Sequence, residues 1–292
     1  MKKTTGEHVF HVINILFMLL IIVAILFPVM NVISLSVSDI DEINSRSVSF
    51  YPKGFQVGAY KEILKNPDFL TALFNTVWVT VAGTFCAIIV TLLVSYAMTK
   101  DFVGKKFFTY FFVLTMYFSG GLIPTYIIYT NVYHLRNTYW VLFLPSLVSV
   151  FYIIVMRSQI ETMPQEVFEA SYIDGANEFQ TVFRIVMPMI TPTIAAISMF
   201  FALNFWNMWF PVMVYTDKSK YWTFQYFLRV AVFDKFFSQY NTLSAGYQVE
   251  ALIPEENYRA AAIVLVAAPI VAIYPFVQKY FVKGIISGAV KG

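Results

Sequence analysis

The chain has 292 residues, of which 59% are hydrophobic and only 13% are charged. Because a soluble domain averages about 25% charged residues, this composition excludes a large soluble core and predicts a polytopic membrane protein. The formal net charge of +3 is too small to indicate a nucleic-acid-binding protein, so the position of the charges matters more than their sum.

The N-terminus carries Lys2 and Lys3 ahead of an apolar run at 12–38. This run is longer than the ~7–15 residues of a signal-peptide apolar region, and no small-x-small cleavage site closes it, so we interpret it as a retained first span. The single cysteine, Cys86, lies inside another apolar run. A disulfide within the chain and a site of several thiolates are thereby excluded, and we expect Cys86 to be a small buried apolar side chain.

Six stretches lack Asp, Glu, Lys and Arg for at least about the 18 residues that a membrane span requires. In hydrocarbon every backbone polar group must be paired within its own segment, so each stretch is predicted to be a helix. The sequence therefore predicts an all-α fold in which residues 1–292 form a single membrane domain of six transmembrane helices. The six stretches are residues 12–38, 69–99, 107–133, 138–156, 185–216 and 260–277.

The orientation follows from the basic residues near the span ends. With the N-terminus inside, Lys and Arg divide equally between the two sides, but the positive-inside rule counts short segments close to the spans. The N-terminus, the 100–106 loop and the tail are rich in Lys, whereas the short outside loop 130–137 carries only Arg136. Both termini are therefore predicted to be cytoplasmic, and the protein is predicted to lie in the cell membrane.

Two long segments then face outward, residues 39–68 and residues 217–258. The first contains an amphipathic piece at 60–64, and the second carries repeated Phe and Tyr among scattered charges. Such aromatic spacing is typical of packing on the outer surface of the bundle or in the headgroup layer. The alternative is a platform for an external partner.

The second and third spans contain residues that should shape helix contacts. Asn75-Thr76 and Gly83 are polar and small positions suited to helix–helix packing. In the third span Gly120-Gly121 is followed closely by Pro124, and this combination should interrupt or bend the helix. A broken span is tolerated only beside protein or a watery cavity, so Tyr117 and Tyr126 are candidates for a substrate pathway.

The fifth span holds two Asn and two Trp at helical spacing in an apolar setting. Asn amides need hydrogen-bond partners inside a membrane, and indole rings offer flat apolar faces. This mixture suits a sugar, although an interfacial aromatic belt explains the same residues. No Asp, Glu, Lys, Arg or His lies in any of the six stretches, which argues against a charged substrate held in mid-membrane and against a proton relay. The candidates are Asn204, Trp206, Asn207 and Trp209.

The polar interval at about 158–184 has helix signals of its own. Pro164 and Glu166 favour a helix start, and Gly175 can close the short helix in a left-handed cap so that Ala176 begins a second one. Small side chains at Ala170 and Ser171 would allow close approach by a partner. The alternative is an ordinary cytoplasmic connector, but the full residue spacing through Pro188 and the position between two spans favour a docking site for a partner subunit.

Residues 169–188 read E-A-S, three residues, Gly175, nine residues, and then I-x-M-P ending at Pro188. This segment resembles the EAA loop of ABC importer permeases, whose pattern is E-A-A, three residues, G, nine residues, I-x-L-P. Only Ser171 and Met187 depart from that pattern, and both preserve size or apolar character. Over its whole length the chain is similar to the carbohydrate branch of these permeases, in particular to the six-span permease subunit of maltose transporters.

The resemblance implies a type I ABC importer permease fold and a subunit that is not itself an enzyme. It implies that two homologous permeases form the pathway, that an ABC ATPase dimer binds ATP and Mg, and that an extracytoplasmic binding protein delivers the sugar. This chain would bind no cofactor and would work by alternating access. The residues implied at the ATPase contact are Glu169, Ala170, Ser171, Asp174, Gly175, Ile185 and Pro188, with Gly284, Gly288 and Lys291 of the tail as further candidates.

Other chemistry finds no support in the sequence. A P-loop pattern is absent, and His8, His11 and His134 are too scattered for a metal cluster. A secondary transporter would want ionisable residues within the spans or an inverted repeat, and a membrane transferase would want a cavity lined by carboxylates or histidine. An ABC permease for peptides or amino acids would share the loop, so it stays open as the alternative.

Overall fold

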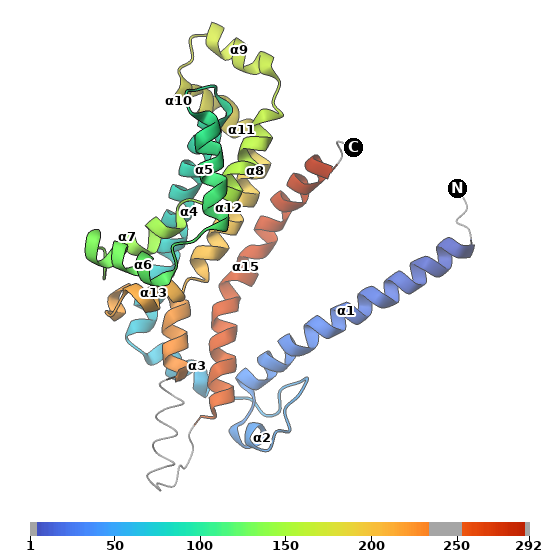
Figure 1. Ribbon diagram of the computed structural model, residues 1–292. Coiled ribbons are helices and arrows are strands. Elements are labelled where there is room, and N and C mark those ends of the chain that lie inside the picture. The colour runs from blue at the N-terminus through green and yellow to red at the C-terminus, as the bar shows by residue number, and fades with distance from the viewer. Residues whose placement is uncertain (1–4, 234–252, 290–292) are drawn as a thin grey trace. The chain divides into compact units, whose positions relative to one another are not determined.

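The structure is a computed structural model that describes residues 5–233 and 253–289. Every regular element in these two ranges is helical (Figure 1), which confirms the all-α prediction. The chain divides into two compact units. One comprises residues 1–67 and 228–270, and the other residues 68–227 and 271–292.

The first unit contains a long N-terminal helix and a folded segment behind it. Apolar side chains are exposed along most of α1, as expected of a helix whose partner is lipid or another chain. The following segment turns back on the end of α1, where the Asp39 N–H donates to the Lys53 carbonyl at 2.9 Å. Its amphipathic piece packs through buried Ile63. The helices are α1 (Thr5–Val37), α2 (Ile40–Asn44), α3 (Gly58–Lys65) and the first part of α15 (Glu255–Ala289).

The second unit is built around α4, which packs against α8 and α12. Its core contains Val79 and Leu92 of α4, Met156 of α8 and Phe201 of α12, all buried. The elements are α4 (Asp68–Thr99), α5 (Lys105–Tyr117), α6 (Leu122–Ile127), η1 (Ile128–Val132), α7 (Trp140–Phe143), η2 (Leu144–Ser146), α8 (Val150–Glu161), α9 (Gln165–Ile173), α10 (Glu178–Gln180), η3 (Thr181–Val186), α11 (Met187–Met189), α12 (Thr191–Trp206), α13 (Phe210–Tyr215) and η4 (Ser219–Tyr221), followed by a helix at Phe224–Phe233.

Three of the six predicted spans are not single helices. The third breaks between α5 and α6 with a bend of 113°, as Gly120-Gly121 and Pro124 predict, and Gly121 has a left-handed φ of +83°. The fourth bends by 53° before α8 and the fifth by 88° before α12. The fifth break falls between Pro188 and Pro192, and each proline lacks the N–H that a continuous helix needs.

Within the described residues, two helices are long and apolar enough to cross a membrane, or up to five if each bent pair counts as one span. The two are Phe10–Val37 and Asp68–Thr99. The sixth predicted stretch, 260–277, lies within α15. One smaller expectation was wrong, because Cys86 is exposed on α4 rather than buried. A membrane helix is apolar on its outer surface too, so an apolar neighbourhood in the sequence does not indicate burial.

Candidate functional site

The helix α9 lies between two apolar helical stretches, and both of its ends follow from local sequence. Pro164 occupies the N-cap position, and Glu166 lies in the first turn. At the other end Gly175 adopts a left-handed φ of +74°. The Ala176 N–H donates to the Ser171 carbonyl at 3.0 Å and the Gly175 N–H donates to the Tyr172 carbonyl at 3.1 Å. These two bonds form a Schellman motif, which confirms the predicted left-handed cap.

The second short helix begins at Glu178, two residues later than predicted. Asn177 supplies the reason, because its side-chain oxygen accepts from the Gln180 N–H at 2.9 Å. The Gln180 side chain in turn accepts from the Asn177 N–H at 3.0 Å. This capping box fixes the start of α10 and leaves Ala176 in the turn.

One face of α9 is open. Glu169 and Ala170 are exposed, as are Asp174 and Gly175 in the turn. Ile173 is 85% exposed, an apolar side chain at the tip of a polar loop. Of the remaining predicted coupling residues, Ile185 is half-buried in η3 and Pro188 is exposed in α11.

The opposite face of α9 packs on its own chain. Ser171 is only 2% exposed, and its hydroxyl donates to the Phe168 carbonyl at 2.7 Å. In this conformation, therefore, Ser171 supports the loop from inside, and the open face is formed by its neighbours. Phe168 and Tyr172 lie on the same side at helical spacing, and both rings lie beneath the Lys100 ammonium, whose Nζ is 5.7 Å and 5.1 Å from their centroids.

Lys100 directly follows α4, and a cluster of hydroxyl, carboxylate and ammonium groups forms around it. Its Nζ donates to the Tyr172 hydroxyl and lies 3.4 Å from Oε2 of Glu178. The same Oε2 accepts a hydrogen bond from the hydroxyl of buried Tyr96, while Oε1 accepts one from the Tyr172 hydroxyl at 3.1 Å. One carboxylate on α10 thus joins α4 to α9.

The charge state of this cluster is well defined. Burial lowers the pKa of Lys100, but the hydrogen bonds that its ammonium donates to Tyr172 and Tyr96 and the charge of Glu178 outweigh it, so the pKa lies above its ordinary value. Lys100 is therefore an ammonium at physiological pH. The Tyr96 ring adds a cation–π contact, with its centroid 4.6 Å from the Lys100 Nζ.

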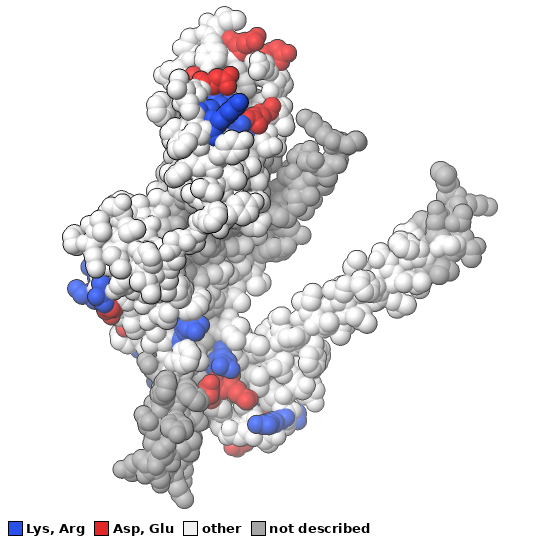
Figure 2. All heavy atoms as spheres, in the orientation of Figure 1, with Lys and Arg blue, Asp and Glu red and all other residues white. Residues whose placement is uncertain are grey.

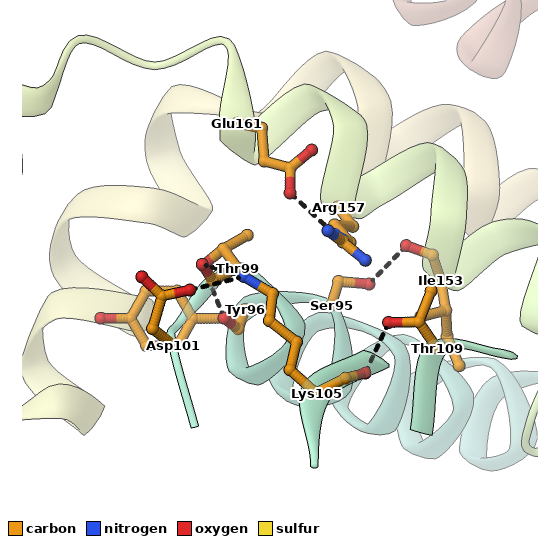
Figure 3. Close-up of polar contacts among 9 residues, drawn as sticks. All are labelled: Ser95, Tyr96, Thr99, Asp101, Lys105, Thr109, Ile153, Arg157 and Glu161. Atoms are coloured by element: carbon orange, nitrogen blue, oxygen red, sulfur yellow. Dashed lines mark hydrogen bonds and ion pairs between the residues drawn. The ribbon is translucent and has the colours of Figure 1, made fainter. Parts of the chain in front are cut away.

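Neighbouring polar contacts of this end lie within single loops or helix pairs (Figure 3). Lys105 donates to Asp101 at 3.1 Å, one turn along the same loop, and Arg157 donates to Glu161 at 2.8 Å within α8. Ser95 donates to the Ile153 carbonyl at 3.0 Å and joins α4 to α8. Unlike the Lys100 cluster, these contacts do not reach α9 or α10.

Charged side chains on the visible face of the second unit gather at the α9–α10 end and again near α7 and α13, with uncharged surface between (Figure 2). In the second group the Arg136 guanidinium donates to Asp217 at 2.8 Å. Two charged ends with an uncharged surface between them are typical of a membrane-spanning unit.

The pathway candidates are not brought together in one place. Asn204 and Asn207 share an exposed side of α12, and Asn207 accepts from the Gln225 amide at 2.9 Å. Trp206 points the other way and is buried, and its indole N–H has no hydrogen-bond partner among the described residues. Tyr126 stacks on Tyr215 with ring centroids 5.9 Å apart. Tyr117 at the end of α5 is exposed, and Trp209 contacts the Phe210 ring.

Comparison with known proteins places this arrangement in a family. The chain is 33% identical over 293 residues to the protein LplC of Bacillus subtilis, covering 100% of this chain and 98% of the relative. It is 32% identical to the polygalacturonan/rhamnogalacturonan transport system permease protein YtcP of Bacillus subtilis, covering 94% and 96%. This chain belongs to the permeases of carbohydrate ABC importers. No family model matches it.

A solved structure supports the assignment of this permease. The structure of a bacterial ABC transporter involved in the import of the acidic polysaccharide alginate aligns with a TM-score of 0.84 at 26% identity. The alignment covers 96% of this chain and 99% of the other. The likeness to a solved importer therefore extends over nearly the full sequence.

Sequence reasoning missed five residues at the α9–α10 end of this permease: Tyr96, Lys100, Ile173, Tyr172 and Glu178. Lys100 carried one signal, because it is the first charge after a long apolar stretch. Phe168 and Tyr172 carried another, since aromatic residues four apart share one helix face. Nothing in the spacing connected these signals to Glu178, which reaches them only through the turn at Gly175.

The tail of the permease is described in part. α15 continues as a helix to Ala289, so Gly284 and Gly288 are helical positions. Lys291 lies outside the described residues, as do residues 234–252 of the predicted outer segment 217–258. The role of the tail toward an ATPase stays a prediction.

Proposed function

We propose that this permease carries an oligosaccharide across the cell membrane by alternating access, driven by separate ABC ATPase subunits that grip the open face of α9. Membership in the carbohydrate ABC importer permeases carries the proposal. The geometry that supports it is a capped short helix with Glu169, Ala170 and Ile173 open to a partner and the opposite face fixed to its own chain. In that contact Glu169 would meet a basic side chain, and Ile173 would enter an apolar cleft.

The assembly that we propose has a second homologous permease, an ATPase dimer holding ATP and Mg, and an extracytoplasmic sugar-binding protein. The permease itself would perform no catalysis and bind no metal. It would cross the membrane six times with both termini in the cytoplasm, the bent pairs each counting as one span and α15 as the sixth. The tail residues Gly284, Gly288 and Lys291 would contact the ATPases.

The substrate class that we propose to test first is an oligosaccharide that carries uronic acids. The relative YtcP is named for polygalacturonan and rhamnogalacturonan, and the solved transporter imports alginate. None of the six apolar stretches contains Lys or Arg. A uronate passing through this subunit would therefore meet amide, indole and hydroxyl groups, with cations supplied at the outer edge or by the sibling permease.

The coupling role is tested by Gly175→Asp in the full transporter reconstituted in vesicles. The left-handed φ of +74° disfavours a side chain, and the new carboxylate would enter the proposed ATPase cleft. We expect the variant to assemble but to lose most of the uptake of a labelled galacturonan oligosaccharide per ATP hydrolysed.

The matched control is Gly104→Asp, because Gly104 also has a left-handed φ, +90°, but caps the start of α5 outside the loop. Unchanged coupling in Gly175→Asp, or equal loss in the control, would count against the docking role. Uptake of a labelled peptide in place of the sugar would favour the alternative of a peptide or amino-acid permease. Uptake from an ion gradient without ATP would favour a secondary transporter.

The orientation is tested by labelling of Ile173→Cys in a Cys86→Ser background with a membrane-impermeant maleimide. We expect modification in inside-out vesicles stripped of the ATPase subunits and protection in right-side-out ones, because the loop would face the cytoplasm and only the ATPases would cover position 173. Asp217→Cys in the same background should show the reverse pattern. Labelling of position 173 from outside would overturn the proposed topology.

A further inference from the structure

The described part of the second unit contains one place where the cytoplasmic end of α4 is joined to both short helices of the loop. We infer that Lys100 and Glu178 form a clasp that fixes the α9–α10 loop to α4, and that they are positioning residues for coupling. This inference rests on the proposed role of α9 toward the ATPases. It concerns the face of α9 that the ATPases would not touch.

The clasp is multidentate, which distinguishes it from an ordinary surface ion pair. The two carboxylate oxygens of Glu178 have separate partners: Oε1 accepts from Tyr172 on α9, and Oε2 accepts from Tyr96 on α4 and lies 3.4 Å from Lys100. A carboxylate with both oxygens engaged has a defined orientation. Its removal would break the polar links of α10 to α4 and α9 together and leave the Lys100–Tyr172 hydrogen bond as the direct polar link between α4 and α9.

The ammonium of Lys100 lies among aromatic rings. Three rings surround its Nζ, with centroids at 4.6 Å for Tyr96, 5.1 Å for Tyr172 and 5.7 Å for Phe168. Its side chain is 33% exposed, against 57% for Glu178. The pair is thus half-shielded, and partial shielding strengthens a charge contact relative to one in bulk water.

The position of the clasp on α9 gives it a mechanical consequence. Phe168 is half-buried and Ser171 is buried, and the Tyr172 hydroxyl is bonded to Lys100 and Glu178, whereas Glu169, Ala170 and Ile173 are exposed. A displacement imposed on the open face therefore reaches α4 directly through the first three residues, and less directly through α8 and α12, which pack on α4. A loosely held loop would move under the ATPases without moving α4 by the direct route.

The alternative is that apolar packing alone transmits the motion. Phe168 belongs to the partly buried residues packed against the core, and Met163 just before α9 does too. If these contacts sufficed, neutralising the ion pair would change nothing in coupling. The experiment therefore has to separate charge from packing.

The test uses the complete transporter in vesicles and measures uptake of the labelled galacturonan oligosaccharide per ATP hydrolysed. Lys100→Met keeps the length and apolar stem of the side chain but removes the charge. We expect uptake per ATP to fall about fivefold or more, the range of coupling between linked sites, while the subunits still co-purify. Lys100→Glu should fall further, because two carboxylates would then face each other.

Rescue and a matched control make the result specific. Adding Glu178→Lys to Lys100→Glu restores opposite charges, and we expect coupling to recover in part, a non-additive result that a general loss of folding would not give. Lys105→Met is the control. Lys105 pairs with Asp101 in the same cytoplasmic segment and does not touch α9 or α10, so coupling should stay at the wild-type value.

A distance measurement provides a readout that is independent of transport. Spin labels at Ala97→Cys on α4 and Ile173→Cys on α9, both exposed positions, with Cys86→Ser, report how firmly the loop is held. The distance distribution should broaden in Lys100→Met and narrow again in the charge-swapped protein. It should be unchanged in Lys105→Met.

The outcomes separate this inference from the proposed function. If the Lys100 variants keep wild-type coupling and a narrow distance distribution while Gly175→Asp uncouples, the clasp is overturned and the docking role stands. If Gly175→Asp also keeps wild-type coupling, the proposed docking role of the loop is wrong, and the inference that rests on it is wrong too. Recovery in the charge-swapped protein, with Lys105→Met unaffected, supports the clasp.

Discussion

The two ends of α4 are held in different ways. At the Asp68 end, Asn75 is buried and its amide donates to the carbonyls of Lys220 and Trp222 at 2.7 Å and 3.0 Å, while its oxygen accepts from the Tyr139 hydroxyl at 2.8 Å. At the other end Lys100 makes half-exposed charged contacts with the α9–α10 loop. The first set is neutral, buried and fully satisfied, whereas the second is charged and reached by water.

This difference indicates which end can move. Next to Asn75, the Thr76 hydroxyl accepts from the Phe224 N–H at 2.6 Å, and further along the helix a Cβ added to Gly83 would lie 2.7 Å from the Phe205 ring. Close packing and buried hydrogen bonds favour one arrangement, because any shift leaves polar groups without partners. The half-exposed groups at the Lys100 end can shift together with the α9–α10 loop at lower cost, so α4 is suited to pivot about its Asn75 end.

The largest effect is expected when the fixed end is broken. Asn75→Leu would leave the Tyr139 hydroxyl and two carbonyls without their partner, at a cost of about 1–3 kcal/mol for each buried group left unpaired. We expect a clear drop in the thermal unfolding temperature of the purified transporter and a reduced folded yield.

Thr80→Val provides the comparison for that variant. Thr80 lies on the same helix, and its buried hydroxyl has no hydrogen-bond partner in the ranges 5–233 and 253–289. Its removal should therefore be nearly neutral. If Asn75→Leu were as stable as Thr80→Val, the Asn75 end would not be the fixed end, and the contrast along α4 would fail.

The two ends also differ in how far the sequence predicts them. The cap at Gly175 was predictable because a Schellman motif depends on a few consecutive residues. The break after α5 was predictable for the same reason, from Gly120-Gly121 and Pro124. Asn75 and Gly83 were predicted only as contact positions, since their partners Trp222 and Phe205 lie more than a hundred residues away in the chain.

The remaining differences arise from packing that a single sequence does not encode locally. An apolar stretch of adequate length predicts one span, but the 88° bend at Ile190 and the turn after Trp206 divide the fifth stretch into α11, α12 and α13. Asn204 and Trp206 were grouped by proximity in sequence. On a helix, residues two apart point to different sides, so one is exposed and the other buried.

The smallest effect is expected at the Arg136–Asp217 pair near the fixed end. The hydrogen bond from Arg136 is the main cause that lowers the pKa of Asp217, and the amide of Asn137 adds to it. A carboxyl whose folded pKa is lowered contributes stability above its ordinary pKa and loses that contribution as the pH falls through the lowered value. At neutral pH the pair is therefore intact.

Backbone contacts support the same loop without charge. The Asn137 N–H donates to the Tyr215 carbonyl at 3.1 Å, and the Asp217 N–H donates to the Asn137 side chain at 2.8 Å. We expect Asp217→Asn to leave thermal stability at neutral pH unchanged. Residues 133–139 should be protected from hydrogen exchange in both proteins at that pH, and the parent should keep its protection, relative to the intrinsic exchange rate, as the pH falls through the lowered pKa of Asp217.

Loss of protection in Asp217→Asn at neutral pH would carry a wider consequence. The loop beside the fixed end would then depend on an exposed ion pair, which salt and water weaken, just as the α9–α10 loop is proposed to depend on Lys100 and Glu178. Both ends of α4 would be adjustable, and the helix could not act as a lever with one fixed end. Protection that persists in Asp217→Asn instead assigns the rigidity of this end to backbone hydrogen bonds and buried packing, and leaves charge control to the Lys100 end alone.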